Sequence, residues 1–304
     1  MPFDALRSAF SSAVSPSPGA LDSSAPVGIF DSGLGGLSVL RAVRAALPDE
    51  RLIYAADSLY APYGERDDDF IADRTLAIGE WLVSQGAKAL VVACNTATSQ
   101  SIALTRERLP IPVIGVEPGI KPAALTSQTR VVGVLATAVT LRSARFQALA
   151  ERHTSDCHFI LQPGHGLVQA VERCDTHSPE LLALLRSYVQ PMLDANADTL
   201  VLGCTHYPFL DQAIRSIAGD RLTLIDTSVA IARQLERQLD SFGLRAAPAQ
   251  AQTIELPREL PRFYSTNDGQ ALRQLAASLL GLDVTVEHVV IPSRRTLALE
   301  SDPV

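Results

Sequence analysis

The chain has 304 residues, of which 47% are hydrophobic and 19% charged, so it is long enough for two domains and can bury a substantial core. Its net charge is −7 and no segment concentrates lysine and arginine, which argues against nucleic acid as a partner. No apolar run is long enough to cross a membrane as a helix, so no membrane span is expected.

The two ends of the chain differ in composition from the rest. Residues 1–25 are rich in alanine, serine and proline, and Asp4 and Arg7 interrupt any apolar core that a signal peptide would need. We therefore predict a flexible N-terminal extension and a cytoplasmic protein. The polar segment 292–304 is predicted to be a flexible tail.

Short apolar runs recur along the chain, and a polar turn and a helical pattern follow each of them. These predicted strands are 27–30, 52–55, 89–93, 113–116, 131–135, 199–202 and 222–225. A series of strand, turn, helix and strand is typical of an α/β protein with a mainly parallel sheet covered by helices on both faces.

Helices are predicted from the spacing of apolar residues. Segment 36–47 places Leu37, Leu40 and Val43 on one face and ends before Pro48. Beyond Asp226, we expect a helix at 229–242, a linker rich in alanine and proline at 246–252, a strand at 262–266 and a helix at 270–280. These last elements are predicted to return to the first half of the fold.

The two halves of this pattern resemble each other. Segment 89–96 aligns with 199–206, so that Cys94 corresponds to Cys204, while 27–32 aligns with 132–137 and 114–116 with 224–226. The repeat predicts two similar lobes, the first made of 26–118 and 227–291 and the second of 119–226. A plainer explanation is that any two α/β halves look alike.

The chain has four cysteines, which we expect to be reduced thiols. Cys94 and Cys204 each follow a predicted strand and begin a predicted helix, a position that lowers the pKa of a thiol and binds anions. Ligands of open α/β sheets bind beyond the carboxyl ends of the strands. Cys157 and Cys174 have no such setting and are interpreted as structural. No metal site is predicted.

If the two lobes face each other, Cys94 and Cys204 lie on opposite sides of one cleft. A stereocentre between them could lose a proton to one thiolate and regain it from the other thiol on the opposite face, which is the geometry of a two-base racemase without a cofactor. A single cysteine of this kind is more often a small buried apolar residue. The matched positions of the two favour chemistry.

Other polar residues surround the predicted thiol sites. Hydroxyl and amide groups in the turns after the strands could stabilise the negative charge of a deprotonated amino acid; they are Ser32, Tyr63, Asn95, Thr96, Thr137 and Thr205. Asp31 and His206 flank the thiols and could exchange protons, although a helix cap and an ordinary turn residue are the alternatives. Glu172 lies within the predicted helix 166–173, where a solvated face is the ordinary interpretation.

Six motifs in order resemble those of the glutamate racemase family. They are 30–37 (FDSGLGGL), 56–58 with 62–64 (ADS, PYG), 93–97 (ACNTA), 135–137 (LAT), 202–208 (LGCTHYP) and 225–228 (IDTS). The resemblance extends from about residue 27 to residue 291. It implies two α/β lobes about a pseudo-twofold axis with the active site between them, usually in a homodimer, and a cofactor-independent enzyme that supplies D-glutamate for peptidoglycan.

The resemblance also implies a role for each site residue. Cys94 would be the base for D-glutamate and Cys204 the base for L-glutamate, with Asp31, Glu172 and His206 assisting. The substrate would be held by Asp31, Ser32, Tyr63, Gly64, Asn95, Thr96, Thr137, Thr205 and His206. The chain departs from the family at Gln162, where cysteine is common, and at Phe146, where tyrosine is usual; His165 has no assigned place.

Three alternatives remain. An aspartate racemase or another two-cysteine racemase would share the lobes and the thiols. A dinucleotide-binding enzyme would use Gly33 and Gly35 after a strand, with Asp57 further on, but Ser38 stands where its fingerprint needs a third glycine or alanine. A non-catalytic amino-acid-binding protein would use the same polar donors but would not need two matched thiols.

Overall fold

The computed structural model of the chain describes residues 22–248 and 259–292. Most of the predicted extension 1–25, the end of the predicted linker 246–252 and all but the first residue of the predicted tail 292–304 lie outside these ranges. Within them, no helix combines the length and the apolar character that crossing a membrane requires.

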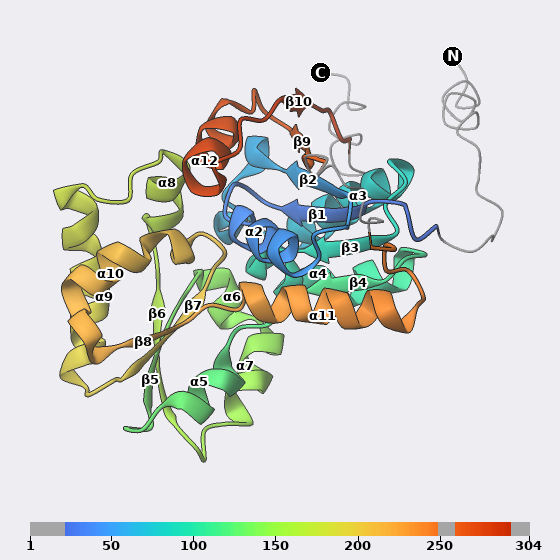
Figure 1. Cartoon of the computed structure of the whole chain (residues 1–304). Helices are drawn as coiled ribbons and strands as arrows, with labels where there is room; N and C mark the ends of the chain where they lie inside the picture. The colour runs from blue at the N-terminus through green and yellow to red at the C-terminus, as the bar shows by residue number, and fades with distance from the viewer. Residues whose placement is uncertain (1–21, 249–258, 293–304) are drawn as a thin grey trace, which may run out of the picture.

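Two all-parallel sheets form the framework, which confirms the predicted α/β class (Figure 1). The first sheet has six strands in the order β10-β9-β2-β1-β3-β4, and the second has four in the order β6-β5-β7-β8. The strands are β1 (Val27–Asp31), β2 (Leu52–Ala56), β3 (Ala89–Val92), β4 (Val113–Gly115), β5 (Val131–Ala136), β6 (His158–Pro163), β7 (Thr199–Gly203), β8 (Thr223–Ile225), β9 (Arg262–Ser265) and β10 (Val286–His288).

Helices connect these strands and cover the sheets. The α-helices are α2 (Leu37–Ala46), α3 (Asp68–Ser84), α4 (Asn95–Arg108), α5 (Ile120–Thr126), α6 (Ala138–Arg142), α7 (Ala144–Glu151), α8 (Leu167–Glu172), α9 (Pro179–Asp194), α10 (Asp211–Ala218), α11 (Ser228–Ser241) and α12 (Gln270–Leu280). Short 3₁₀ helices are η1 (Ser58–Tyr60), η2 (Tyr63–Glu65), η3 (Tyr207–Leu210) and η4 (Gly219–Arg221).

Each strand and helix for which the sequence predicted both ends has a counterpart, and no end differs by more than one residue. Strands β6 and β10 were not predicted. Strand β6 lies at the edge of its sheet, all of its residues are partly or fully exposed, and its sequence HFILQP mixes apolar residues with His158, Gln162 and Pro163. It therefore lacks the continuous apolar run that burial on both faces imposes on a central strand.

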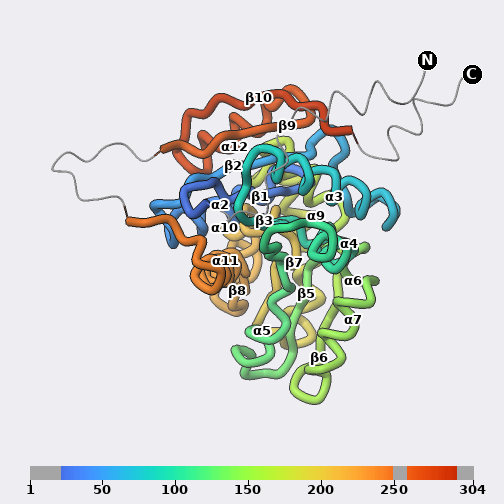
Figure 2. The backbone as a smooth tube through the Cα atoms, turned by 90° about the vertical axis from the view of Figure 1, so that its right-hand side faces the viewer, coloured from blue at the N-terminus to red at the C-terminus, as the bar shows by residue number. Residues whose placement is uncertain are grey.

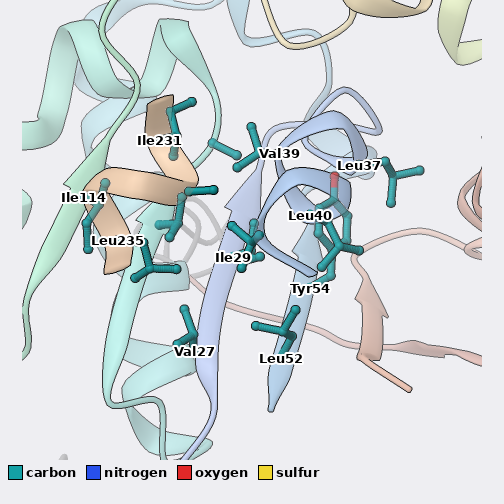
Figure 3. Packing of buried hydrophobic residues seen from close by; sticks show 14 of the residues in the cluster. Val27, Ile29, Leu37, Val39, Leu40, Leu52, Tyr54, Ile114, Ile231 and Leu235 are labelled. Carbon is teal, nitrogen blue, oxygen red and sulfur yellow. The ribbon is translucent and has the colours of Figure 1, made fainter. Parts of the chain in front are cut away.

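The first sheet is covered on both faces, and the alternation along β1 shows why its sequence is apolar from Val27 to Phe30. Val27 and Ile29 pack in one core with residues of α2 and α11 (Figure 3), and residues of α12 belong to the same core. Phe30 points to the other face, where it packs with residues of α3 and α4. Successive side chains of a strand point to opposite faces, so both sets of side chains are buried when the strand is covered on both sides, and both sets are then apolar.

The second sheet follows the same rule. Leu135 belongs to a core made with α8, α9 and α10, whereas its neighbour Val134 packs with residues of α5 and α7. Figures 1 and 2 place α12 and β10 at one end of the molecule and α5 at the other.

The strand orders show the internal repeat. The strands β2-β1-β3-β4 of the first sheet correspond one by one to β6-β5-β7-β8 of the second, because each set has the same order along the chain and all strands are parallel. Cys94 and Cys204 follow the corresponding strands β3 and β7. Because the first sheet takes its strands from 27–115 and 262–288 and the second from 131–225, we propose the lobe division 26–118 with 227–291, and 119–226.

Helix α11 follows the last strand of the second sheet but packs on the first lobe. Its residues Ile231 and Leu235 lie among Val39 of α2 and Ile114 of β4 (Figure 3). This contact carries the chain back to the first sheet before β9.

We expect Leu235→Ala to lower the free energy of unfolding by about 2–5 kcal/mol, because it empties a fully buried position in this core. Val229→Ala, in the same helix at a position 56% exposed, should change it by no more than about 0.5 kcal/mol. Denaturant unfolding of both variants measures the difference, and equal small effects would show that α11 does not stabilise the first lobe.

Candidate active site

The predicted site residues gather at the carboxyl ends of the central strands of both sheets. The turn 31–36 follows β1, Cys94 comes shortly after β3, Thr137 follows β5, and the turn 204–206 follows β7. Ligands of open parallel sheets bind beyond the carboxyl ends of the strands.

Cys94 caps the N-terminus of α4. Its Sγ accepts a hydrogen bond from the backbone N–H of Ala97 at 3.4 Å and lies 3.2 Å from Oγ of Ser32. Burial, together with the negative charge of Asp31, raises the pKa of Cys94 to about 12. The N–H of Ala97 at the helix end does lower this pKa, but burial outweighs it, so the expectation that the pKa of Cys94 lies below its usual value is wrong.

Cys204 directly follows β7 and is buried like Cys94. Contrary to the prediction, it does not begin an α-helix: a turn closed by the N–H of Tyr207 and the carbonyl of Cys204 leads into η3, and α10 begins only at Asp211. The carbonyl of Thr205 instead accepts a hydrogen bond from Oγ of Ser38 at 3.2 Å. Sγ of Cys204 lies 3.7 Å from Nδ1 of His206.

His206 connects Cys204 to Glu172. Its Nε2 lies 2.6 Å from Oε1 of Glu172, and the same oxygen accepts the N–H of Leu34 at 2.8 Å. Burial by itself lowers the pKa of His206, but hydrogen bonds and negative charge from Cys204 and Glu172 raise it well above its usual value. Glu172 therefore does not lie on a solvated helix face, and its carboxylate contacts the opposite lobe.

Asp31 is fully buried at the end of β1. Its carboxylate accepts the N–H of Gly33 at 3.0 Å and the hydroxyl of Thr205 at 3.3 Å. Burial raises the pKa of Asp31, and the charge of His206 opposes this shift. The N-cap of α2 is Gly36, so Asp31 does not cap that helix with its side chain.

Both thiols thus take part in polar contacts of two adjoining turns. Cys94 contacts Ser32, and Cys204 contacts His206. The hydroxyl of Thr205, next to Cys204, donates to Asp31, next to Ser32, and so joins the two turns. Negative charge on Cys204 raises the pKa of Cys94, so the two sulfur atoms act on each other electrostatically. The residues come from both lobes.

Glycines allow the two lobes to approach this closely. A Cβ atom at Gly35 would collide with the His206 ring and the Thr205 hydroxyl, and one at Gly33 would collide with the Glu172 carboxylate. Contact between the lobes therefore explains Gly33 and Gly35, the two glycines that favoured a dinucleotide site.

Threonine hydroxyls form a second group beside Cys94. Oγ1 of Thr96 lies 2.9 Å from Oγ1 of Thr137, which caps α6 by accepting the N–H of Thr140. Thr140 contacts both of the other hydroxyls and was not predicted. Its position three residues after a threonine cap was the available signal, because a cap and the third residue of its helix face each other.

Asn95, the first residue of α4, is 95% buried. Its Nδ2 finds no hydrogen-bond partner within the part of the chain that the structure describes. A buried amide donor without a partner is unfavourable, so its presence here indicates that a ligand supplies the acceptor.

Tyr63 and Gly64 are neighbours in the chain but have different surroundings. The hydroxyl of Tyr63 donates to Oδ2 of Asp57 at 2.5 Å, so this hydroxyl has a partner inside the protein. A Cβ on Gly64 would lie 3.1 Å from Cβ of Thr137. A cavity of about 30 Å³ opens between Gly64 and Thr137, and His165 is part of its lining.

The remaining predicted residues lie elsewhere. Cys157 is buried near Phe146 in the core of the second lobe, and Cys174 is exposed just after α8. The side chain of Gln162 donates to the carbonyl of Pro163. Over residues 22–248 and 259–292, no group of three or more histidine, cysteine or acidic residues could hold a metal ion.

Comparison with known proteins gives a consistent result. Residues 37–235 match the Asp/Glu/Hydantoin racemase family. A glutamate racemase of Ralstonia pickettii is 63% identical over 257 residues, which cover 84% of this chain and 88% of that protein.

Solved structures also resemble this one. Escherichia coli glutamate racemase, determined with L-glutamate and the activator UDP-MurNAc-Ala, has a TM-score of 0.77 and 31% identity, and the match covers 88% of this chain and all of that one. The Francisella tularensis enzyme, determined with D-glutamate, has a TM-score of 0.75 and 26% identity over 88% of this chain and 98% of its own. The chain therefore belongs to the Asp/Glu/hydantoin racemase family and, within it, to the glutamate racemases.

Proposed function

We infer that this chain interconverts L- and D-glutamate and propose that Cys94 and Cys204 transfer the α-proton without a cofactor. The observation that carries the proposal is that the two thiols follow corresponding strands of the two sheets and that a hydrogen bond between Thr205 and Asp31 joins the turns beside them. The names of the relatives favour glutamate over aspartate as the substrate. A binding protein would have no use for this pair of thiols.

The reaction needs one thiolate and one thiol at the start. For L-glutamate, the thiolate of Cys204 takes the α-proton, the C–H electron pair moves into the carboxylate group, and the thiol of Cys94 donates its proton to the opposite face. Cys94 is then the thiolate and Cys204 the thiol. D-glutamate reacts by the reverse sequence. The raised pKa of Cys94 supports this assignment, because it keeps that sulfur protonated before L-glutamate reacts.

The groups around the thiols have complementary roles. The imidazolium of His206, held by Glu172, stabilises the Cys204 thiolate. Asp31 assists differently on the side of Cys94, by exchanging a proton. Negative charge that develops on the substrate is stabilised by hydrogen-bond donors in a site shielded from water. The proposed donors are Ser32, Asn95, Thr96, Thr137 and Thr205, with the backbone at Gly64.

This activity supplies D-glutamate for peptidoglycan. We propose that the enzyme works in the cytoplasm, where reducing conditions keep both thiols free, and that it forms a homodimer, as the family resemblance implies.

We expect Cys94→Ser and Cys204→Ser each to lower racemisation by at least about 100-fold, because a serine hydroxyl is a much weaker acid and base than a thiol. Both variants should still bind glutamate by calorimetry, and Cys157→Ser should keep the wild-type rate. Incubation of either enantiomer in D₂O should place deuterium at Cα of the wild-type product. Wild-type turnover by either active-site variant would exclude the two-thiol mechanism.

Asn95→Leu should separate stability from binding. It removes an unpaired buried donor, which costs about 1–3 kcal/mol, so the ligand-free variant should be at least as stable as the wild type. The KM for glutamate should rise about tenfold or more. Thr98 lies in the same helix, and its hydroxyl donates to the carbonyl of Val92 and accepts the N–H of Val116. Thr98→Val breaks both hydrogen bonds, so it should destabilise the protein and leave KM unchanged. Thermal unfolding and steady-state kinetics test both; an unchanged KM for Asn95→Leu would contradict the role of Asn95.

Glu172→Gln should change the pH dependence of the reaction. Since Glu172 raises the pKa of His206, its loss should lower that pKa, and the imidazolium should then disappear at lower pH. We expect kcat/KM for L-glutamate to fall about tenfold or more and its alkaline limb to move to lower pH. Glu180→Gln, at an exposed position of α9, is the matched control. A limb that stays in place would mean that Glu172 does not act through His206.

A further inference from the structure

The segment 57–66, here called the substrate loop, connects β2 to α3 and contains η1 and η2. We propose that Arg74 of α3 is a positioning residue for the racemase reaction, because together with Asp57 it holds the substrate loop in the place where Gly64 meets Thr137. The inference rests on the proposed function, in which the backbone at Gly64 contacts the substrate.

The guanidinium group of Arg74 forms hydrogen bonds with its edge and stacks on an aromatic ring with its face. Its Nε and Nη2 donate to the two carboxylate oxygens of Asp57 at 2.9 and 2.6 Å. Its Nη1 donates to the carbonyl of Ile291, and its Cζ lies 4.3 Å from the centre of the Tyr60 ring. Both partners of the ion pair have fully buried side chains.

Asp57 connects Arg74 to the substrate loop and to β1 by further hydrogen bonds. Its Oδ2 also accepts the hydroxyl of Tyr63, and its backbone N–H donates to the carbonyl of Asp31. The loop is therefore held at Tyr60 by the guanidinium face, at Asp57 by two charge-assisted hydrogen bonds, and at Tyr63 through Asp57. Bidentate pairing of this kind fixes orientation as well as distance.

The Tyr63 hydroxyl cannot donate to the substrate while it donates to Asp57. The contribution of Tyr63 and Gly64 to binding must then come from where the loop is placed, and Gly64 is packed closely against Thr137 of the opposite lobe. A shift of the loop would move Gly64 relative to Thr137 and the donors beside it. Misplacement of substrate-binding groups by a small distance is enough to weaken binding.

A purely structural role is the competing explanation. Buried ion pairs are costly to desolvate and add little net stability compared with apolar residues of similar volume, so stability alone does not account for this one. The chain offers a matched comparison in the first lobe. Lys88 and Glu50 form another buried ion pair, 2.6 Å apart, just before β3 and β2, at the end of the sheet opposite to the site.

The test compares Arg74→Lys, Tyr63→Phe, their double variant and Lys88→Met in the full chain. Arg74→Lys keeps the charge but loses the two-pronged geometry. We expect Arg74→Lys and Tyr63→Phe each to raise the KM for L- and D-glutamate about fivefold to tenfold, with a smaller change in kcat. The double variant should be no worse than the poorer single variant by more than about twofold, because both changes release the same loop. Lys88→Met should lower the melting temperature but leave KM within twofold of the wild type.

Unchanged KM in folded Arg74→Lys would overturn the inference, and so would an equal rise of KM in Lys88→Met. If Arg74→Lys does not fold, Tyr63→Phe decides alone, since it removes only the hydroxyl that Asp57 holds, and an unchanged KM again overturns the inference. The two-thiol proposal is judged separately by the cysteine variants, so a failure here leaves it standing.

Discussion

The site depends on the close approach of two turns, 31–36 after β1 and 204–206 after β7, which belong to different sheets. The approach is possible because side chains are absent at Gly33 and Gly35. It is held by hydrogen bonds from one lobe to the other, between Thr205 and Asp31 and between Leu34 and Glu172. Every group that could assist a thiol is placed by these contacts, so a small relative movement of the lobes would disturb the acid–base groups on both sides together.

The two halves of the site have similar backbones because of the repeat, but the charged groups around their thiols differ. Cys94 caps a helix and lies near a buried carboxyl group, whereas Cys204 is followed by a turn and has an imidazole and a carboxylate beside it. The first environment favours the thiol, because both burial and the charge of Asp31 oppose ionisation of Cys94. The second supplies a cation for a thiolate. A two-base racemase needs this inequality, since two thiols or two thiolates could not both remove and return a proton.

Several polar groups are buried around the site at a cost to stability. Asp31 is fully buried, Asn95 carries an unpaired donor, and the Arg74–Asp57 pair is shielded from water. Buried polar groups are tolerated when they are paired, and the unpaired one lies where a substrate carboxylate could complete it. The apolar layers on both faces of each sheet supply the stability that allows this concentration of polar groups at one edge.

The sequence by itself was enough to predict the α/β class, most strands, the repeat and the matched cysteines, because strands buried on both faces must be apolar and polar turns must follow them. It could not indicate β6, whose edge position removes that requirement, or the contact of Glu172 with His206, which joins residues far apart in the chain. It also led to the wrong direction for the pKa of Cys94 and could not show that the Tyr63 hydroxyl is used by Asp57. Local patterns determine secondary structure and residue type, whereas burial, pairing and charge around a side chain depend on which distant segments the fold brings against it.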